Sequence, residues 1–300
     1  MADGAAAYAA LDRETVFPAR DGRALHGRVF AAREPSAVMV INPATGYPAR
    51  FYTAFAEAAR EQGWVVLTYD YRGQGQSLRD TARRDPARMI DWALEDIPAA
   101  ARRACELYPG LPLDVVGHSV GGQFAAFIPE DLPLRRVALL SASGGYWGKQ
   151  SAPLKYFAWT FWRVLGPALL ATRGHIPKGA LWSGEPLPPG VWKDWRDFCV
   201  NPEGFRDRFA ELGLNERFRR FNAPIRAWVP DDDPIANPAT VRWLLECYET
   251  APSEMKIVRR EDLGRGPIGH DGLFRTKMAD VFWPQVLRWL ALQPQRVAAE

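Results

Sequence analysis

The sequence is poor in cysteine: its 300 residues include three, Cys105, Cys199 and Cys247. They are far apart, odd in number and form no C-x-x-C pair. This pattern disfavours both a disulfide framework and a structural zinc site. Isolated thiols are typical of proteins from a reducing compartment. We therefore expect no metal ion and no other cofactor.

The sequence also lacks a strong charge of one sign and a long apolar run. Its 38 basic and 35 acidic residues give a net charge of +3, which argues against a dedicated nucleic-acid-binding protein. The best membrane candidate, Tyr156–Ala171, is too short to span a bilayer and is interrupted by Arg163, Gly166 and Pro167. Met1–Leu11 has no basic n-region. We expect a cytoplasmic protein without a signal peptide, a nucleic-acid partner or stable membrane insertion.

What the sequence does contain is an alternation of short apolar runs with longer helical patterns. Runs that are apolar throughout are typical of strands buried on both faces. The candidate strands are Ala24–Ala31, Ala37–Asn42, Trp64–Tyr69, Leu113–Val116, Val137–Ser141, Ile225–Val229 and Glu254–Val258. The helical patterns are Arg50–Gln62, Met89–Leu107, Gly121–Phe127, Pro238–Tyr248 and Leu273–Leu290. This alternation predicts an α/β fold with a mostly parallel sheet and helices on both faces.

One long segment, Gly144–Asn222, contains no credible strand. It includes six of the twelve tryptophans, twelve Lys or Arg residues and seven Asp or Glu residues. We interpret it as a mainly helical insertion at 144–222 within a single core formed by 1–143 and 223–300. Its aromatic residues favour either an apolar substrate pocket or the hydrophobic core of the insertion itself.

A G-x-S-x-G pentapeptide, Gly117–Gly121, stands between the strand candidate Leu113–Val116 and the helical pattern Gln123–Phe127. This strand–turn–helix setting is the one required of a nucleophile elbow. Small residues let the strand and the helix approach each other while the serine is held in a strained backbone conformation. Ser119 is therefore the candidate nucleophile, and the alternative is a glycine-rich turn with an incidental serine.

A serine nucleophile needs a base, and the sequence offers four histidines. His118 lies inside the pentapeptide, where its side chain should point away from the Ser119 hydroxyl. His26 lies in an early hairpin and His175 in the insertion. His270 follows the last candidate strand and precedes the last helical pattern, a position from which it can reach Ser119. We predict that His270 is the base.

The acid that orients the base is expected between the serine and the histidine in the chain. The strand Ile225–Val229 is followed by three adjacent aspartates within Pro230–Pro234. We favour Asp233, and Asp232 is the alternative acid. The three aspartates could instead form a solvated turn, but adjacent like charges repel one another, so at least one is expected to have a partner.

An oxyanion hole needs two backbone N–H groups. The first is expected from Val120, directly after the nucleophile. The second is expected from the loop Asn42–Gly46 after the strand Ala37–Asn42. Pro43 has no N–H group, so Ala44 is the first choice and Thr45 the second.

With these residues in place, the chain resembles the α/β-hydrolase family. The segment Asp70–Ser77 is similar to the family's D-x-R-G-x-G-x-S loop. More narrowly, the chain resembles a bacterial subgroup of serine aminopeptidase-like and lysophospholipase-like α/β-hydrolases. The shared loops are Asn42–Gly46, Tyr69–Gly73, Gly145–Trp147 and Ile268–His270.

The resemblance covers about Val16–Ser143 and Ile225–Leu290. It implies a Ser-Asp-His triad and a helical cap over the site, which would be the insertion. One departure is that Asn42-Pro43 replaces the more usual His-Gly of the oxyanion loop.

These expectations lead to a serine hydrolase that cleaves an ester or thioester with an apolar acyl group, with a small molecule as its partner. A peptidase or an acyltransferase could use the same triad. A non-catalytic ligand-binding protein could share the fold. A further alternative concerns Tyr156–Ala171, which together with its nearby basic residues could be an interfacial helix for lipid substrates or a cap helix packed on the core.

Overall fold

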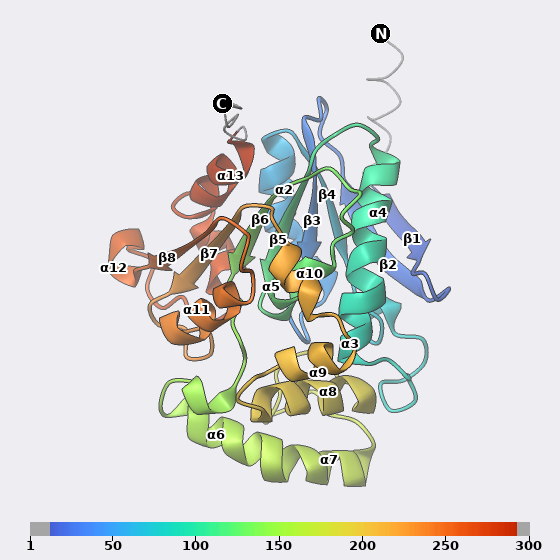
Figure 1. The fold of residues 1–300 in the computed structure, drawn as a ribbon, viewed down its shortest axis with the longest axis vertical. Coiled ribbons are helices and arrows are strands. Elements are labelled where there is room, and N and C mark those ends of the chain that lie inside the picture. The colour runs from blue at the N-terminus through green and yellow to red at the C-terminus, as the bar shows by residue number, and fades with distance from the viewer. Residues whose placement is uncertain (1–12, 293–300) are drawn as a thin grey trace.

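The computed structural model describes residues 13–292, so the expectation that Met1–Leu11 is no signal peptide lies outside the described residues. An eight-stranded sheet runs through the molecule in the order β1-β2-β4-β3-β5-β6-β7-β8 (Figure 1). The strands are β1 (Arg13–Pro18), β2 (Ala24–Phe30), β3 (Ala37–Asn42), β4 (Trp64–Tyr69), β5 (Leu113–His118), β6 (Leu134–Leu140), β7 (Ile225–Pro230) and β8 (Ser253–Val258). Strands β4, β3, β5, β6, β7 and β8, which are neighbours in this order, are parallel. Strand β2 runs antiparallel to both β1 and β4.

Helices cover both faces of the sheet, as the pattern of the central strands requires. All six residues of β3 are buried. Alternate side chains point to opposite faces, since Val38 and Val40 belong to one hydrophobic cluster and Met39 and Ile41 to the other. The first cluster packs on α4 (Ile97–Leu107) and α11 (Pro238–Glu246), and the second on α2 (Thr53–Glu61) and α13 (Trp283–Ala291). The predicted α/β class is confirmed.

The core also contains three shorter helices. They are α3 (Met89–Asp91), α5 (Val120–Gln123) and α12 (Arg260–Leu263). A π-helical turn at Trp92–Asp96 joins α3 to α4, so the predicted helical pattern Met89–Leu107 is continuous. Pro98 lies in the first turn of α4, where a missing N–H costs no hydrogen bond.

Two elements differ from the sequence prediction. Strand β1 was not predicted because only Thr15 and Phe17 of its six residues are buried, so it carries no apolar run. The predicted helix Leu273–Leu290 is wrong in its first half: two 3-10 turns precede α13, which begins at Trp283. Pro284 explains this start, because inside a longer helix it would remove a hydrogen bond and clash with the carbonyl four residues back.

The segment between β6 and β7 contains five α-helices and no strand beyond two isolated bridges. The helices are α6 (Leu154–Thr160), α7 (Gly166–Arg173), α8 (Pro189–Val200), α9 (Arg206–Glu211) and α10 (Asn215–Arg220). Figure 1 shows α6 and α7 as the outermost layer, on the far side of α8 and α9 from the sheet. Within residues 13–292, no helix combines the length and the apolar character needed to cross a membrane.

Candidate active site

The turn after β5 has the geometry of a nucleophile elbow. Ser119 has φ 52° and ψ −116°, a strained conformation for a residue with a side chain. Glycine is required on both sides of it: a Cβ at Gly117 would lie 2.5 Å from the Cα of Gly122, and one at Gly121 would lie 2.2 Å from the carbonyl oxygen of Asn42. The pentapeptide therefore packs β5, α5 and the end of β3 tightly while presenting Ser119 at the carboxyl edge of the sheet.

Three side chains that the sequence singled out come together at this edge. The Ser119 Oγ lies 3.0 Å from His270 Nε2, and His270 Nδ1 lies 2.8 Å from Asp233 Oδ2. Because the carboxylate can only accept, Nδ1 carries a proton, which leaves Nε2 of the neutral ring free to accept from the Ser119 hydroxyl. Asp233 is almost fully buried, whereas the His270 side chain keeps 17% of its exposure.

The three adjacent aspartates have three different sets of partners. Asp231 forms an ion pair with Arg260. The two carboxylate oxygens of Asp232 accept the backbone N–H groups of Ile268 and Gly269, each at 2.9 Å. Asp232 thus holds the loop that carries the histidine. Asp233 alone contacts the imidazole. Asp232, the alternative acid, therefore contacts the backbone of the histidine loop and not the imidazole ring.

The charges at the site shift two pKa values in the direction that a general base needs. Burial alone would lower the pKa of His270, but the charge and hydrogen bond of Asp233 outweigh it and raise that pKa above its ordinary value. Burial alone would likewise raise the pKa of Asp233, but His270 and the Ile235 and Ala236 amides outweigh it and lower it. Asp233 is therefore ionised wherever the imidazole titrates.

A buried hydrogen-bonded chain behind the triad was not anticipated from the sequence. The Ala44 N–H donates to Tyr52 Oη at 2.8 Å, and Tyr52 Oη lies 2.9 Å from His118 Nδ1. On the other side of the ring, His118 Nε2 lies 3.0 Å from the carbonyl oxygen of His270. Both ring nitrogens of His118 therefore contact groups other than the Ser119 hydroxyl. The ring links the oxyanion loop, the elbow and the histidine loop.

The protons of this chain can be assigned from its partners. A carbonyl oxygen only accepts, so His118 Nε2 must carry a proton. Burial and the neighbouring His270 lower the pKa of His118 to about 3, so the ring is neutral and Nδ1 has no proton. Tyr52 therefore donates its hydroxyl proton to Nδ1. Two sequence features together could have indicated this hydrogen bond. His118 directly precedes Ser119, and Tyr52 ends the single 3-10 turn that follows the loop 42–46.

The hydrogen bonds of the loop 42–46 disfavour Ala44, the first choice made on the sequence for the second oxyanion donor. Val120 is the first residue of α5, where a helix has no carbonyl of its own to offer the N–H group. The Ala44 N–H is already bound to Tyr52. The Thr45 N–H has no hydrogen-bond partner among residues 13–292. The structure thus leaves Thr45, and not Ala44, with an unoccupied donor in this loop.

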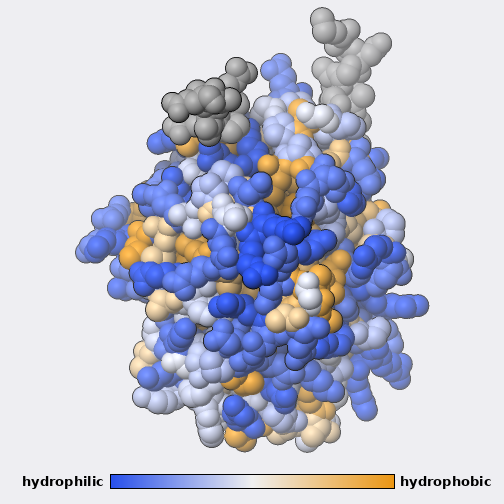
Figure 2. All heavy atoms as spheres, in the orientation of Figure 1, coloured by the Kyte–Doolittle hydropathy of each residue, from blue (hydrophilic) through white to orange (hydrophobic). Residues whose placement is uncertain are grey.

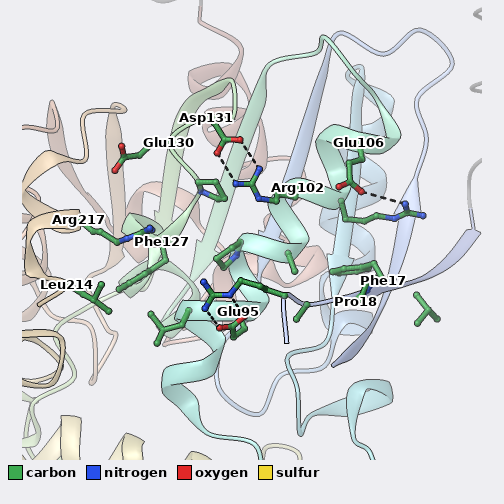
Figure 3. A pocket seen from close by; sticks show the side chains of 18 residues that line it. Phe17, Pro18, Glu95, Arg102, Glu106, Phe127, Glu130, Asp131, Leu214 and Arg217 are labelled. Atoms are coloured by element: carbon green, nitrogen blue, oxygen red, sulfur yellow. Dashed lines mark hydrogen bonds and ion pairs between the residues drawn. The ribbon is translucent and has the colours of Figure 1, made fainter. Parts of the chain in front are cut away.

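A large hollow lies away from these residues. It has a volume of about 960 Å³ and runs along α4 (Figure 3). Its rim carries the ion pairs Arg20–Glu95, Arg102–Asp131 and Arg103–Glu106. Neither the triad nor the oxyanion loop lines it. Among residues 13–292, no group of three or more His, Cys, Asp or Glu side chains is arranged to bind a metal ion.

A mostly parallel sheet with a strained serine at the end of β5, and a histidine and an aspartate on the loops after later strands, defines an α/β-hydrolase. Solved structures of similar shape include an esterase from Pyrococcus furiosus (TM-score 0.63, 14% identity, 93% of this chain and 90% of that one). Another is a carboxyl esterase from Bacillus coagulans (TM-score 0.58, 18% identity, 93% of this chain and 97% of that one). At these identities the likeness shows the fold.

The family model for serine aminopeptidase, S33, matches residues 33–187, just over half of the chain. The chain therefore belongs to this family of α/β-hydrolases. It is also 30% identical over 121 residues to RutD of Caulobacter vibrioides, provisionally designated a carbamate hydrolase. That match spans 40% of each chain.

Proposed function

We propose that the protein hydrolyses an ester or thioester with an apolar acyl group through Ser119, His270 and Asp233. His270 takes the Ser119 proton as Oγ attacks the acyl carbonyl, and it returns the proton to the leaving group. Asp233 keeps the His270 tautomer and stabilises the imidazolium. A water activated by His270 then hydrolyses the acyl-enzyme. The observation that carries this proposal is the unbroken contact from Ser119 Oγ through His270 to Asp233.

In this proposal the oxyanion formed during attack is held by the N–H groups of Val120 and Thr45. The choice of Thr45 over Ala44 rests on the hydrogen bond that already occupies the Ala44 N–H group. Releasing that bond would leave the buried Tyr52 hydroxyl without its donor, at a cost of about 1–3 kcal/mol.

We propose that the inserted segment 144–222 acts as a cap on this site, with 13–143 and 223–292 as the described part of the core. In support, the Glu185 N–H donates to the Gly46 carbonyl at 2.8 Å, and a Cβ at Gly46 would lie 2.3 Å from the Trp182 ring. A hollow of about 350 Å³ lies between the two parts. It is lined by Gly46, Tyr47 and Asp271 of the core and by Ser183 of the insert, among others. We assign it as the route by which substrate reaches the site.

An ester fits this site better than a peptide with a free amino terminus. An aminopeptidase needs a carboxylate in the cap to hold the substrate ammonium. All seven carboxylates of 144–222 already have a partner: Glu185, Asp194, Asp197, Glu203, Asp207, Glu211 and Glu216. An incoming ammonium would have to displace one of these partners.

A substrate screen tests the reaction class. 4-Nitrophenyl esters of increasing acyl length, the matching acyl thioesters and amino-acid 4-nitroanilides are compared by kcat/KM with the full-length protein. We expect esters or thioesters of longer acyl chains to be the best substrates, because apolar area adds binding energy. A clear preference for the amino-acid anilides would replace the proposal by an aminopeptidase.

The pH dependence of kcat/KM should report the imidazole of His270. The base acts only when neutral, and its pKa is raised in the folded protein. Activity is therefore lost as the pH falls through a midpoint above the ordinary histidine value of about 6.5. The measurement is the pH–rate profile with a soluble ester. A midpoint well below 6.5 would contradict control by an Asp233-paired His270.

A further inference from the structure

The outermost helix of the insert has one face packed inward and one face that no described residue covers. The helix is formed by α6, a π-helical turn and α7, and it runs from 154 to 173. Its inner face is buried and packs on Trp192 and Trp195 of α8. The buried residues of that face are Ala158, Phe161, Trp162 and Gly166. The helix is therefore held firmly on the molecule, whatever its outer face contacts.

The outer face is apolar. Four of the nine large apolar side chains that are exposed among residues 13–292 lie on this one helix: Tyr156 (64%), Phe157 (44%), Trp159 (46%) and Val164 (50%). Figure 2 shows apolar spheres exposed at the lower end of the molecule, where Figure 1 places α6 and α7. Single exposed apolar residues are ordinary, but three aromatic rings on one helix face mark a contact surface.

The charged side chains of this helix are of one sign. No Asp or Glu occurs in the 53 residues from Leu132 to Gly184, while the helix carries Lys155, Arg163 and Arg173. None of these three cations forms an ion pair within the described part of the chain. The Lys155 ammonium lies 5.2 Å from the centre of the Tyr156 ring, so positive charge borders the aromatic rings directly.

We propose that this helix docks on a lipid surface that contains anionic lipids. Aromatic side chains favour the depth of the lipid headgroups, an apolar helix face enters the boundary of the acyl chains, and cations bind the acidic headgroups. A second copy of the chain fits the surface less well. A symmetric contact would set the three cations of one helix against the three of its partner. The docking requires no turnover, so it stands independently of the proposed reaction.

Vesicle sedimentation tests the docking. The full-length protein is mixed with phosphatidylcholine vesicles and with vesicles that also contain phosphatidylglycerol. We expect it to pellet with the acidic vesicles, less with the neutral ones, and less with both when salt is added. Lys155→Gln and Arg163→Gln should each weaken binding to acidic vesicles by about fivefold. Phe157→Ser with Trp159→Ser should weaken binding to both kinds of vesicle.

Matched controls come from strand β8 at the sheet edge. Ile257 is as exposed as Trp159, at 46%, and Lys256 beside it is an exposed cation. Ile257→Ser and Lys256→Gln should leave vesicle binding unchanged. All variants should keep the wild-type thermal unfolding temperature and activity on a soluble ester, because every changed side chain is exposed or partly exposed and lies outside the triad.

Three outcomes would overturn the docking. One is that the wild type binds neither kind of vesicle. Another is that the β8 variants lose as much binding as the helix variants. The last is found by sedimentation velocity: if the wild type self-associates and Phe157→Ser with Trp159→Ser abolishes that association without changing vesicle binding, the face is an interface between copies of the chain.

Discussion

Replacing Ser119 by alanine is expected to abolish labelling by a fluorophosphonate probe and to lower kcat on the best ester by roughly 10⁶-fold. The reason is that the probe and the substrate both need an oxygen nucleophile whose proton His270 can take, and Ser119 Oγ is the hydroxyl within hydrogen-bond distance of that ring. The measurements are mass spectrometry of the labelled protein and steady-state kinetics.

Ser141 provides a matched control for this experiment. It lies at the end of the neighbouring strand β6, also has a positive φ of 53°, and is buried. Within the described residues its Oγ has no hydrogen-bond partner, so no base there is placed to activate it. Ser141→Ala should keep the labelling and the activity. Labelling of Ser119→Ala at any other residue would remove Ser119 from the proposed mechanism.

The second large effect is expected at Asp233. An Asp233→Asn variant should lose about 10⁴-fold in kcat, because the amide can donate to His270 Nδ1 and stabilise the wrong tautomer. The neighbouring Asp232→Asn variant removes one of two acceptors for the Ile268 and Gly269 amides. Its loss should be roughly tenfold, the effect of one charge-assisted hydrogen bond on the position of the loop.

Both aspartate variants are compared by kcat on a soluble ester at saturating concentration, with thermal unfolding to show that each is folded. Fluorophosphonate titration gives the fraction of competent sites, so that kcat refers to folded enzyme. An equal loss in the two variants, or a larger loss in Asp232→Asn, would exchange the roles of the two carboxylates.

The sequence carried enough information for the sheet, because β3, β4 and β5 are apolar throughout and buried on both faces. It also singled out Ser119 and His270 as candidates, since a pentapeptide and a scarcity of histidines leave few choices. It could not separate Asp232 from Asp233. Adjacent residues in a turn point in different directions, and only the backbone decides which one meets the ring.

The oxyanion loop shows a second limit of sequence reasoning. The choice between Ala44 and Thr45 depends on the hydroxyl of Tyr52, which reaches back from the turn before α2. The same hydroxyl is hydrogen-bonded to His118 Nδ1, and this contact lets His118 link the loop 42–46 to the histidine loop. Such a contact joins residues that lie far apart in the sequence, 66 positions in the case of Tyr52 and His118, and no local pattern of apolar or small residues encodes it.

Hydrogen bonds connect Ala44 through Tyr52 and His118 to His270. The two variable positions of the G-x-S-x-G pentapeptide, 118 and 120, should therefore differ in how well they tolerate substitution. In the proposed mechanism the position after the nucleophile contributes only a backbone N–H group, so many side chains could occupy it. The position before it must supply one acceptor and one donor on opposite sides of a flat ring. Mutational tolerance at 118 is therefore tied to the residue at 52, and the two positions should vary as a pair in an evolving or engineered enzyme.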